Sequence, residues 1–251
     1  MNQINQDQFT YLGHKGQGHF GQVFEGINNV TGEKVAIKVM NVLQLINENV
    51  FNKIQREFDC MKKCECENSV KLFDVKYYPD EIHMIIELCD IDLNKLLYEY
   101  HNNVPFTVEE IRDLFLKLNN GFKVLRKNNI VHRDLKPDNI MIKYTKDKTG
   151  IIPKISDYGL SKVLLSEYNN TMAPSCQWYM APELIGGTKY NEKVDLWSIG
   201  CIMYELYTKK CYFNEIKYGK NIRYILNNYY YGNNRRNNLE LNFYDLLVKL
   251  L

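Results

Sequence analysis

The chain has 251 residues and a mass of 29.7 kDa, with 45% hydrophobic and 25% charged residues. This is a globular composition, and it excludes a disordered or collagen-like chain. The formal net charge of +2 gives no electrostatic basis for binding nucleic acid or a membrane surface. No apolar run approaches the roughly 20 residues that a membrane span needs, and the polar segment 1–8 lacks the apolar core of a signal peptide. We expect an intracellular protein, cytoplasmic or nuclear, without a nucleic-acid partner or membrane insertion.

The N-terminal third of the chain favours strands with one helix. Segments 20–27 and 35–40 are rich in β-branched and aromatic residues and flank a turn, which predicts two strands. Apolar residues three or four positions apart predict a helix over 48–64, and two further strands are expected at 70–77 and 82–87. The pattern predicts a small sheet accompanied by one helix.

After Cys89 the pattern changes to long helices. Thr107 and Glu110 have the spacing of a capping box, and apolar residues recur at helical spacing after them. The segment 194–207 is apolar nearly all round, which is typical of a helix buried in the centre of its domain. We therefore expect an α+β chain, with a strand-rich N-terminal lobe and a helical C-terminal lobe that meet near 87–89.

Three of the seven cysteines, Cys60, Cys64 and Cys66, lie close together. They suggest a metal site, but structural zinc sites pair two close ligand doublets, and no second doublet follows at a suitable spacing. The alternative, which we favour, is a helix end that carries small buried thiols. An odd number of cysteines without a secretion signal also indicates reduced thiols.

A glycine-rich pattern, G-x-G-x-x-G-x-V, occupies residues 16–23. A dinucleotide-binding loop needs a helix directly after its glycines, whereas a β-branched, aromatic strand follows here. A glycine loop between two strands instead forms a flap whose backbone amides can lie over phosphates.

Lys38 lies at the end of the apolar segment 35–38, and Glu57 follows 19 residues later on the predicted helix, roughly opposite its apolar stripe. The lysine could be an ordinary strand-edge residue with its ammonium in water. It could also be a phosphate-binding cation held by the carboxylate of Glu57. The glycine loop favours the second interpretation.

Further motifs follow in order along the chain. They are His132-Arg133-Asp134-Leu135-Lys136-Pro137-Asp138-Asn139, Asp157-Tyr158-Gly159, Ala181-Pro182-Glu183 and the segment 195–200. Together with the glycine loop, they resemble the signature of the eukaryotic protein kinase family over residues 9–251. The resemblance implies a bilobal α+β fold, with an N-lobe over 9–88 and a C-lobe over 89–251. Lys136-Pro137 is typical of the serine/threonine branch.

The resemblance implies transfer of the γ-phosphate of ATP to serine or threonine hydroxyls of protein substrates, with Mg²⁺. Asp134 would orient the attacking hydroxyl, and Lys136 would lie against the γ-phosphate. Asn139 and Asp157 would be the oxygen ligands of Mg²⁺. Lys38, paired with Glu57, would hold the α- and β-phosphates.

The resemblance also implies a nucleotide site between the lobes. The loop over the nucleotide would consist of Lys15, Gly16, Gln17, Gly18, His19, Phe20 and Gly21. The residues around adenine would be Val23, Ala36 and Met141, with backbone groups near Glu87 and Cys89 at its edge and Ile86 as gatekeeper. A column of side chains, Met61, Leu72, His132 and Tyr158, would join the lobes.

Three residues depart from the family pattern. Tyr158 replaces the usual phenylalanine, and its hydroxyl needs a partner if it is buried. Lys15 stands where an apolar residue usually covers the nucleotide, although its aliphatic stem can cover apolar surface. Cys176 replaces a threonine or serine that bridges the catalytic aspartate and lysine, and a thiol is a poor donor. We expect a slower enzyme rather than an inactive one.

The chain also stops before the family's arginine that pairs with the glutamate matched by Glu183. We therefore expect a C-terminally incomplete domain in which Glu183 is buried without that partner. The main alternative function is a pseudokinase, a nucleotide-binding scaffold that acts through protein–protein interaction.

Regulation and substrate choice stay open in the sequence. Arg133 could receive a phosphate placed on Thr171 by an upstream activating kinase. Asp92, Asp138 and Glu205 could read arginines of a substrate, or Asp92 could cap a helix and Glu205 could support the structure.

Overall fold

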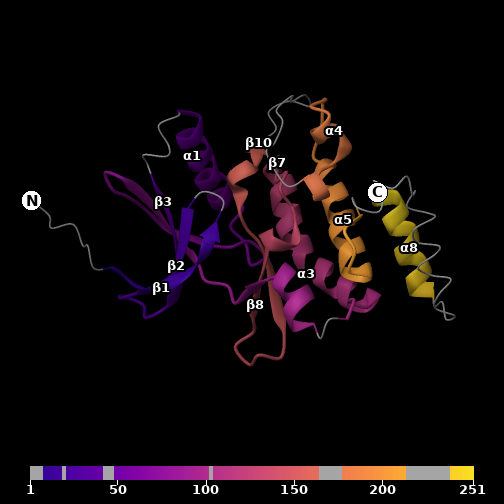
Figure 1. Ribbon diagram of the computed structural model, residues 1–251, viewed down its shortest axis with the longest axis horizontal. Helices are drawn as coiled ribbons and strands as arrows, with labels where there is room; N and C mark the ends of the chain where they lie inside the picture. Colours follow the sequence, from indigo (N-terminus) through magenta and orange to yellow (C-terminus); the bar gives the residue numbers. More distant parts are fainter. Residues whose placement is uncertain (1–7, 19–20, 42–47, 102–103, 164–176, 213–237) are drawn as a thin grey trace, which may run out of the picture.

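The computed structural model describes residues 8–18, 21–41, 48–101, 104–163, 177–212 and 238–251. The chain forms two lobes side by side, with the sheet at the N-terminal end and most helices at the other (Figure 1). The α+β bilobal fold is therefore confirmed. Within the described ranges, no helix combines the length and apolar character needed to cross a bilayer.

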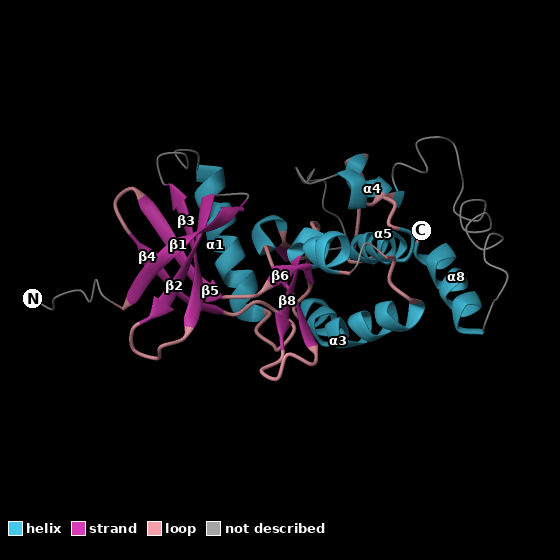
Figure 2. Ribbon diagram, turned by 60° about the horizontal axis from the view of Figure 1, so that its bottom comes forward, coloured by secondary structure: helices cyan, strands magenta, loops and turns pink. Residues whose placement is uncertain are grey.

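The N-lobe is a five-stranded antiparallel sheet of order β1-β2-β3-β5-β4. Its strands are β1 (Phe9–Gly18), β2 (Gly21–Asn28), β3 (Lys34–Asn41), β4 (Leu72–Tyr77) and β5 (Glu81–Glu87). The helix α1 (Glu48–Lys63) lies between this sheet and the C-lobe (Figure 2). The four predicted strands and the predicted helix are all present, with ends shifted by one or two residues.

The C-lobe is built on two long helices, α3 (Val108–Lys127) and α5 (Val194–Thr208). The predicted capping box begins α3: Thr107 Oγ1 accepts a hydrogen bond from the Glu110 amide, and the Glu110 carboxylate accepts one from the Thr107 amide. Shorter helices complete the lobe: α2 (Leu93–Lys95), the π-helix η2 (Leu96–Tyr100), α4 (Pro182–Ile185) and α8 (Asn238–Leu250).

Helix α5 is buried around most of its circumference, as its apolar sequence predicts. Gly200 permits close contact with the C-terminal helix, because a Cβ atom there would lie 2.9 Å from the Leu250 Cβ. One hydrophobic core runs through both lobes, from Met40 and Ile54 in the N-lobe to Leu247 in α8.

Short strands and 3-10 turns carry the segments between the lobes. A three-stranded sheet has the order β6-β8-β9, and a second pair joins β10 to β7. The bounds are β6 (Ile91–Asp92), β7 (Ile130–Val131), β8 (Ile140–Tyr144), β9 (Ile151–Ile155), β10 (Lys162–Val163), η3 (Pro137–Asn139), η4 (Tyr158–Leu160) and η5 (Gln177–Tyr179). These elements carry the motifs 132–139 and 157–159.

Candidate active site

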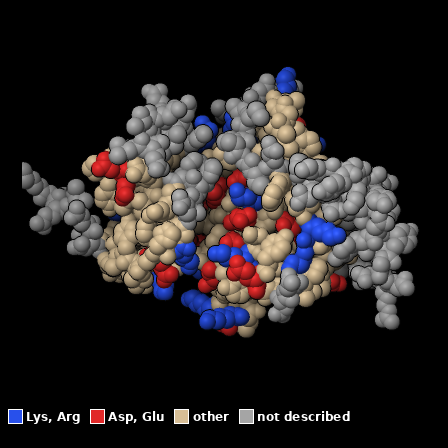
Figure 3. Space-filling model, in the orientation of Figure 1, with Lys and Arg blue, Asp and Glu red and all other residues tan. Residues whose placement is uncertain are grey.

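Charged side chains of both signs gather along the boundary between the two lobes (Figure 3). At this boundary, Lys38 on β3 donates a 2.8 Å hydrogen bond to Glu57 Oε1 on α1, which confirms the predicted pair. Lys38 is 6% exposed and Glu57 is 1% exposed. Burial alone lowers the pKa of Lys38, but the charges of Glu57 and Asp157 outweigh burial and raise this pKa. Lys38 is therefore a fixed, buried cation at this boundary.

The predicted position of Glu57 on its helix was wrong. Glu57 does not lie opposite the apolar stripe of α1 but within the buried side, beside Ile54, Phe58 and Met61. The reason is that α1 packs against the C-lobe turn η4 and β10 as well as β4, so its buried side is wider than the apolar stripe. The ammonium of Lys38 compensates the buried carboxylate.

Asp157 lies on the other side of Lys38, with 3.8 Å between its Oδ1 and the lysine Nζ. Its backbone is left-handed, with φ 59° and ψ 69°, a conformation that costs a non-glycine residue about 1–2 kcal/mol. The preceding residue, Ser156, donates its amide hydrogen to the carbonyl oxygen of Asn139 at 3.0 Å. The two candidate Mg²⁺ ligands, Asn139 and Asp157, are thereby tied to each other through the backbone.

Asp134 and Asn139 form the second half of this cluster. The Asn139 amide nitrogen donates to the Asp134 carbonyl oxygen at 2.7 Å and to Asp134 Oδ2 at 2.9 Å. Lys136 Nζ lies 3.2 Å from the same Oδ2. Since the Asn139 nitrogen makes these bonds, its amide oxygen is the atom able to bind a cation. Asp134 is held by both neighbours in one orientation.

Asp195, at the start of α5, supports this loop and had no predicted role. Its carboxylate accepts hydrogen bonds from the amides of His132 at 2.8 Å and Arg133 at 2.9 Å. Arg133 has a left-handed φ of 64°. Burial raises the pKa of Asp195, although these two amides act in the opposite direction. A local pattern gives no signal for this contact, because Asp195 lies more than 60 residues from the loop that it holds.

Tyr158 has the partner that its hydroxyl needs. Its Oη lies 2.8 Å from Ser69 Oγ, and the side chain is 1% exposed. The His132 ring packs on Tyr158 with 5.3 Å between centroids, and Met61 and Leu72 belong to the same core. The contact between His132 and Tyr158 in the predicted column is therefore present, and the rest of the column stays a prediction.

The glycine-rich segment begins in the β1–β2 hairpin. Gly16, Gln17 and Gly18 end β1, and the register pairs Gly18 with Gly21. A Cβ atom at Gly21 would overlap the carbonyl oxygen of Val39 on β3, so glycine is required at this close approach. His19 and Phe20, at the tip of the predicted loop, lie outside the described residues.

The residues predicted around adenine lie on strands that face the boundary between the lobes. Ala36, on β3, is buried, and Val23, on β2, is half-buried. Met141, on β8, is half-buried and pairs with Asp92 and Lys154. The β5 strand carries Ile86 and ends at Glu87, where the chain crosses to the C-lobe.

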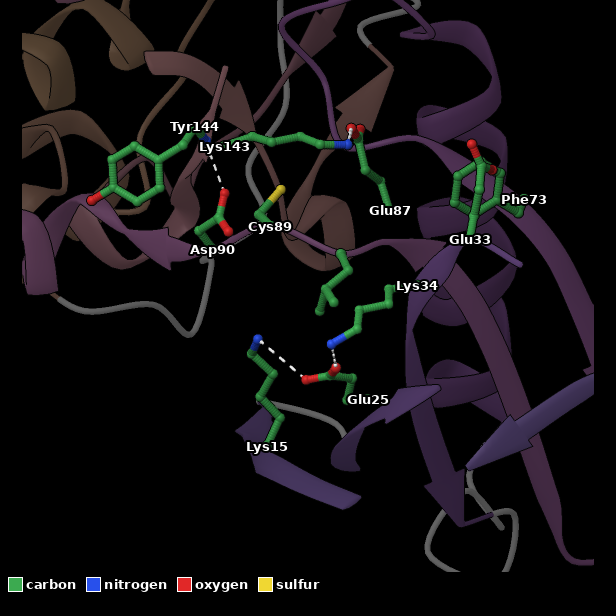
Figure 4. Close-up of a pocket in the computed structure, with 11 residues that line it drawn as sticks. Lys15, Glu25, Glu33, Lys34, Phe73, Glu87, Cys89, Asp90, Lys143 and Tyr144 are labelled. Atoms are coloured by element: carbon green, nitrogen blue, oxygen red, sulfur yellow. Dashed lines mark hydrogen bonds and ion pairs between the residues drawn. The ribbon is translucent and has the colours of Figure 1, made fainter. Parts of the chain in front are cut away.

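A pocket of about 470 Å³ opens beside this crossing (Figure 4). It includes three of the predicted nucleotide residues, and its lining is Lys15, Glu25, Glu33, Lys34, Phe73, Glu87, Leu88, Cys89, Asp90, Lys143 and Tyr144. Lys38, Asp134 and Asp157 do not line it. The pocket is therefore at the outer, hinge-side end of the predicted nucleotide site.

Ion pairs fix the side chains around this pocket. Glu87 lies 2.6 Å from the Lys143 ammonium and 3.1 Å from that of Lys154. Lys15 lies 3.9 Å from Glu25, which also binds Lys34 at 2.7 Å. The charge of Lys15, which stands where the family pattern has an apolar residue, is thus balanced by Glu25 on the adjacent strand.

The acidic residues considered for substrate arginines have different surroundings. Asp92 Oδ1 accepts a hydrogen bond from the Lys95 amide at 2.7 Å and caps α2, as the structural alternative predicts. Glu205 is buried, and its two carboxylate oxygens accept hydrogen bonds from the hydroxyls of Tyr98 at 2.7 Å and Tyr179 at 2.5 Å. Asp138 is exposed. Glu205 therefore supports the structure.

Several other predictions have an outcome. Cys60 and Cys64 at the end of α1 are buried thiols whose pKa is raised by burial, as the helix-end interpretation predicts, whereas Cys66 is only half-buried. Glu183 is half-buried, so the expectation of a buried carboxylate was wrong: α4, on which it lies, has its N-terminal turn at the surface. Thr171 and Cys176 lie outside the described residues.

Comparison with known proteins agrees with this geometry. The family model of the protein kinase domain matches residues 9–251. Cyclin-dependent kinase 20 of Danio rerio is 34% identical over 80% of this chain and 57% of its own, and cyclin-dependent kinase C-3 of Oryza sativa subsp. japonica is 32% identical over 81% and 64%. Serine/threonine-protein kinase ATG1c of Arabidopsis thaliana is 30% identical over 94% of this chain and 32% of its own. The chain thus spans less than two thirds of each of these relatives.

Proposed function

The chain belongs to the protein kinase family, and we propose that it transfers the γ-phosphate of ATP to serine or threonine hydroxyls of protein substrates. One observation carries the proposal. Lys38, Asp157 and the pair Asp134 and Asn139 come from three separate segments and form one connected set of ion pairs and hydrogen bonds. Catalysis of phosphoryl transfer is mostly positioning and charge neutralisation, which such a set provides.

Each residue has a task that fits its position. Asp134 accepts the hydrogen bond of the substrate hydroxyl and orients its oxygen toward the phosphorus. Lys136, on the same carboxylate, places its charge beside the transferred group. Lys38, held by Glu57, binds the α- and β-phosphates. The cations Lys38 and Lys136 would therefore lie along a triphosphate that extends from β3 to the segment 132–139.

The residues present fit a magnesium ion. Asn139 and Asp157 offer oxygen atoms, the ligand type that Mg²⁺ prefers, and they are tied together through Ser156. Asn139 and Asp157 would hold the ion, and its chemistry there would be to neutralise phosphate charge. Asp157 keeps its carboxylate beside Lys38, so this side chain can serve the ion and the lysine together.

The nucleotide base would lie between Val23 and Ala36 above and Met141 below, against the chain at Glu87 and Cys89. The β-strand character of all three apolar positions supports this placement, since strands present side chains at fixed spacing. The lining of the hinge-side pocket by Lys15, Glu87 and Cys89 supports it further.

A pseudokinase scaffold is the alternative. The presence and connection of Lys38, Asp134, Asn139 and Asp157 favour transfer, and the relatives named above are kinases. We further propose that the partners are protein substrates and an upstream activating kinase. The described cysteines are free thiols, which supports a reducing compartment, cytoplasm or nucleus.

The test compares wild-type protein with Asp134→Ala, using ATP labelled at the γ-phosphate and a library of serine- and threonine-containing peptides. Asp134→Ala should lower transfer by at least about 100-fold while Mg²⁺–ATP affinity, measured by calorimetry, changes little. Asp113→Ala, an exposed aspartate on α3, is the matched control and should transfer normally. Wild-type protein that binds Mg²⁺–ATP and transfers nothing would establish the scaffold instead.

A further inference from the structure

Ser69 lies in the linker between α1 and β4, far from Asp157 in sequence, and is 1% exposed. Backbone hydrogen bonds join this linker to the end of β9. The Val70 amide donates to the Ile155 carbonyl oxygen at 2.9 Å, and the Ile155 amide donates to the Asn68 carbonyl oxygen at 2.9 Å. The linker is thereby fixed to a residue two positions before Asp157.

The side chain of Ser69 provides a second connection, on the other side of Asp157. Its Oγ lies 2.8 Å from Tyr158 Oη, one residue after Asp157. A tyrosine hydroxyl and a serine hydroxyl can each donate or accept, so either oxygen can be the donor in this hydrogen bond. The His132 ring packs against the Tyr158 ring, with 5.3 Å between centroids.

Asp157 therefore lies between two attachments to the same linker. Its left-handed backbone, at φ 59° and ψ 69°, is a conformation that persists only where the surroundings determine it. The attachment through Ile155 uses backbone atoms and would exist with any side chains. The attachment through Tyr158 needs two hydroxyls, one on each partner.

We propose that Ser69 is a positioning residue for Asp157: its hydrogen bond to Tyr158 holds the aspartate in the orientation that faces Lys38 and the metal. This inference rests on the proposed function, because it assigns Asp157 to the bound Mg²⁺–ATP. A phenylalanine in place of Tyr158 would fill the same volume but could not make this bond. The hydroxyl of Tyr158 would thus help to orient Asp157, in addition to the packing of the ring in the core.

The experiment uses Ser69→Ala, Tyr158→Phe and the double variant in the full chain. Each single variant leaves one buried hydroxyl without its partner and should lower the stability to urea. The double variant removes both hydroxyls and should recover much of that stability. Tyr11→Phe is the matched control, because Tyr11 also loses a hydroxyl bond, to His83 on β5, away from Asp157.

The expected result separates positioning from stability. All three variants should lower kcat by about threefold to tenfold with an unchanged KM for the peptide, and the double variant should stay low although its stability returns. The gain in ATP affinity on adding Mg²⁺, measured by calorimetry, should shrink in the same three variants and not in Tyr11→Phe.

Other outcomes overturn the inference. Recovery of kcat together with stability in the double variant would make the pair purely structural, as would a normal kcat in Ser69→Ala. Wild-type protein with a Mg²⁺-dependent gain in ATP affinity but no transfer would contradict the proposed function alone, and the calorimetric comparison would still decide on Ser69. Wild-type protein that binds no ATP would refute both.

Discussion

The ammonium of Lys38 and the carboxylate of Glu57 meet at 2.8 Å in a position where neither residue is more than 6% exposed. The pair joins the middle of the N-lobe sheet to α1. A charge pair removed from water gains little net stability, but each charge becomes costly if its partner is lost. The arrangement of α1 on the sheet therefore depends on both charges being present.

Replacement of Lys38 by methionine should lower the free energy of unfolding by about 3–5 kcal/mol, because the carboxylate of Glu57 stays buried without its cation. The double variant Lys38→Met/Glu57→Met should recover most of this loss in urea denaturation, while phosphate transfer remains absent from both. Equal stability of the single and double variants would show that Glu57 is not a buried charge in the folded protein.

Gly21→Ala should destabilise the N-lobe by at least about 2 kcal/mol, because its Cβ atom would overlap the backbone carbonyl of Val39 and force β2 away from β3. Gly16→Ala is the matched control in the same glycine pattern. Nothing lies within 4 Å of a Cβ atom at Gly16, so its unfolding free energy should change by less than about 0.5 kcal/mol. Thermal unfolding of both variants measures the difference. Equal losses of stability in the two variants would contradict the close approach of Gly21 to the Val39 carbonyl.

The carboxylate of Glu87 should make stability depend on pH. Burial alone raises its pKa, but Lys143 and Lys154 outweigh burial, and the pKa lies below its ordinary value of 4.5. For an acid whose pKa is lowered in the folded protein, the stabilisation is complete at a pH above the ordinary pKa. It is lost as the pH falls through the lowered pKa. Glu87→Gln should therefore cost about 1–3 kcal/mol at pH 7, and its difference from wild type should shrink below pH 4.5.

The control for this measurement is Glu65→Gln. Glu65 forms an exposed pair with Lys71 at 3.2 Å, with side chains 60% and 51% exposed, so its loss should cost less than about 1 kcal/mol. A pH profile of urea denaturation from 7 to 3.5 compares the three proteins. Parallel curves for wild type and Glu87→Gln would contradict the lowered pKa.

The sequence predicts the parts of this fold whose signals are local. The capping box at Thr107 and the apolar circumference of α5 each lie within one element, and both are present. The motif pattern predicts the pairing of Lys38 with Glu57. It does not predict which face of α1 carries Glu57, because amphipathic spacing does not show how many neighbours will cover a helix.

The remaining features depend on residues distant in the chain. Asp195 binds the backbone of His132 and Arg133, and Ser69 binds Tyr158 from a linker 89 residues earlier. Neither aspartate nor serine has a local pattern that indicates such a partner. The two-residue strands β6, β7 and β10 are likewise too short for a periodic signal.

The guanidinium of Arg133 donates to the Leu160 carbonyl oxygen at 2.8 Å and to the Tyr190 hydroxyl at 3.0 Å. Leu160 follows Asp157 by three residues, so the two left-handed residues of the site, Arg133 and Asp157, share a short mechanical connection. The first turn after Asp157 is therefore fixed to the loop at Arg133 through the uncharged carbonyl of Leu160, and this link does not depend on a second charged group.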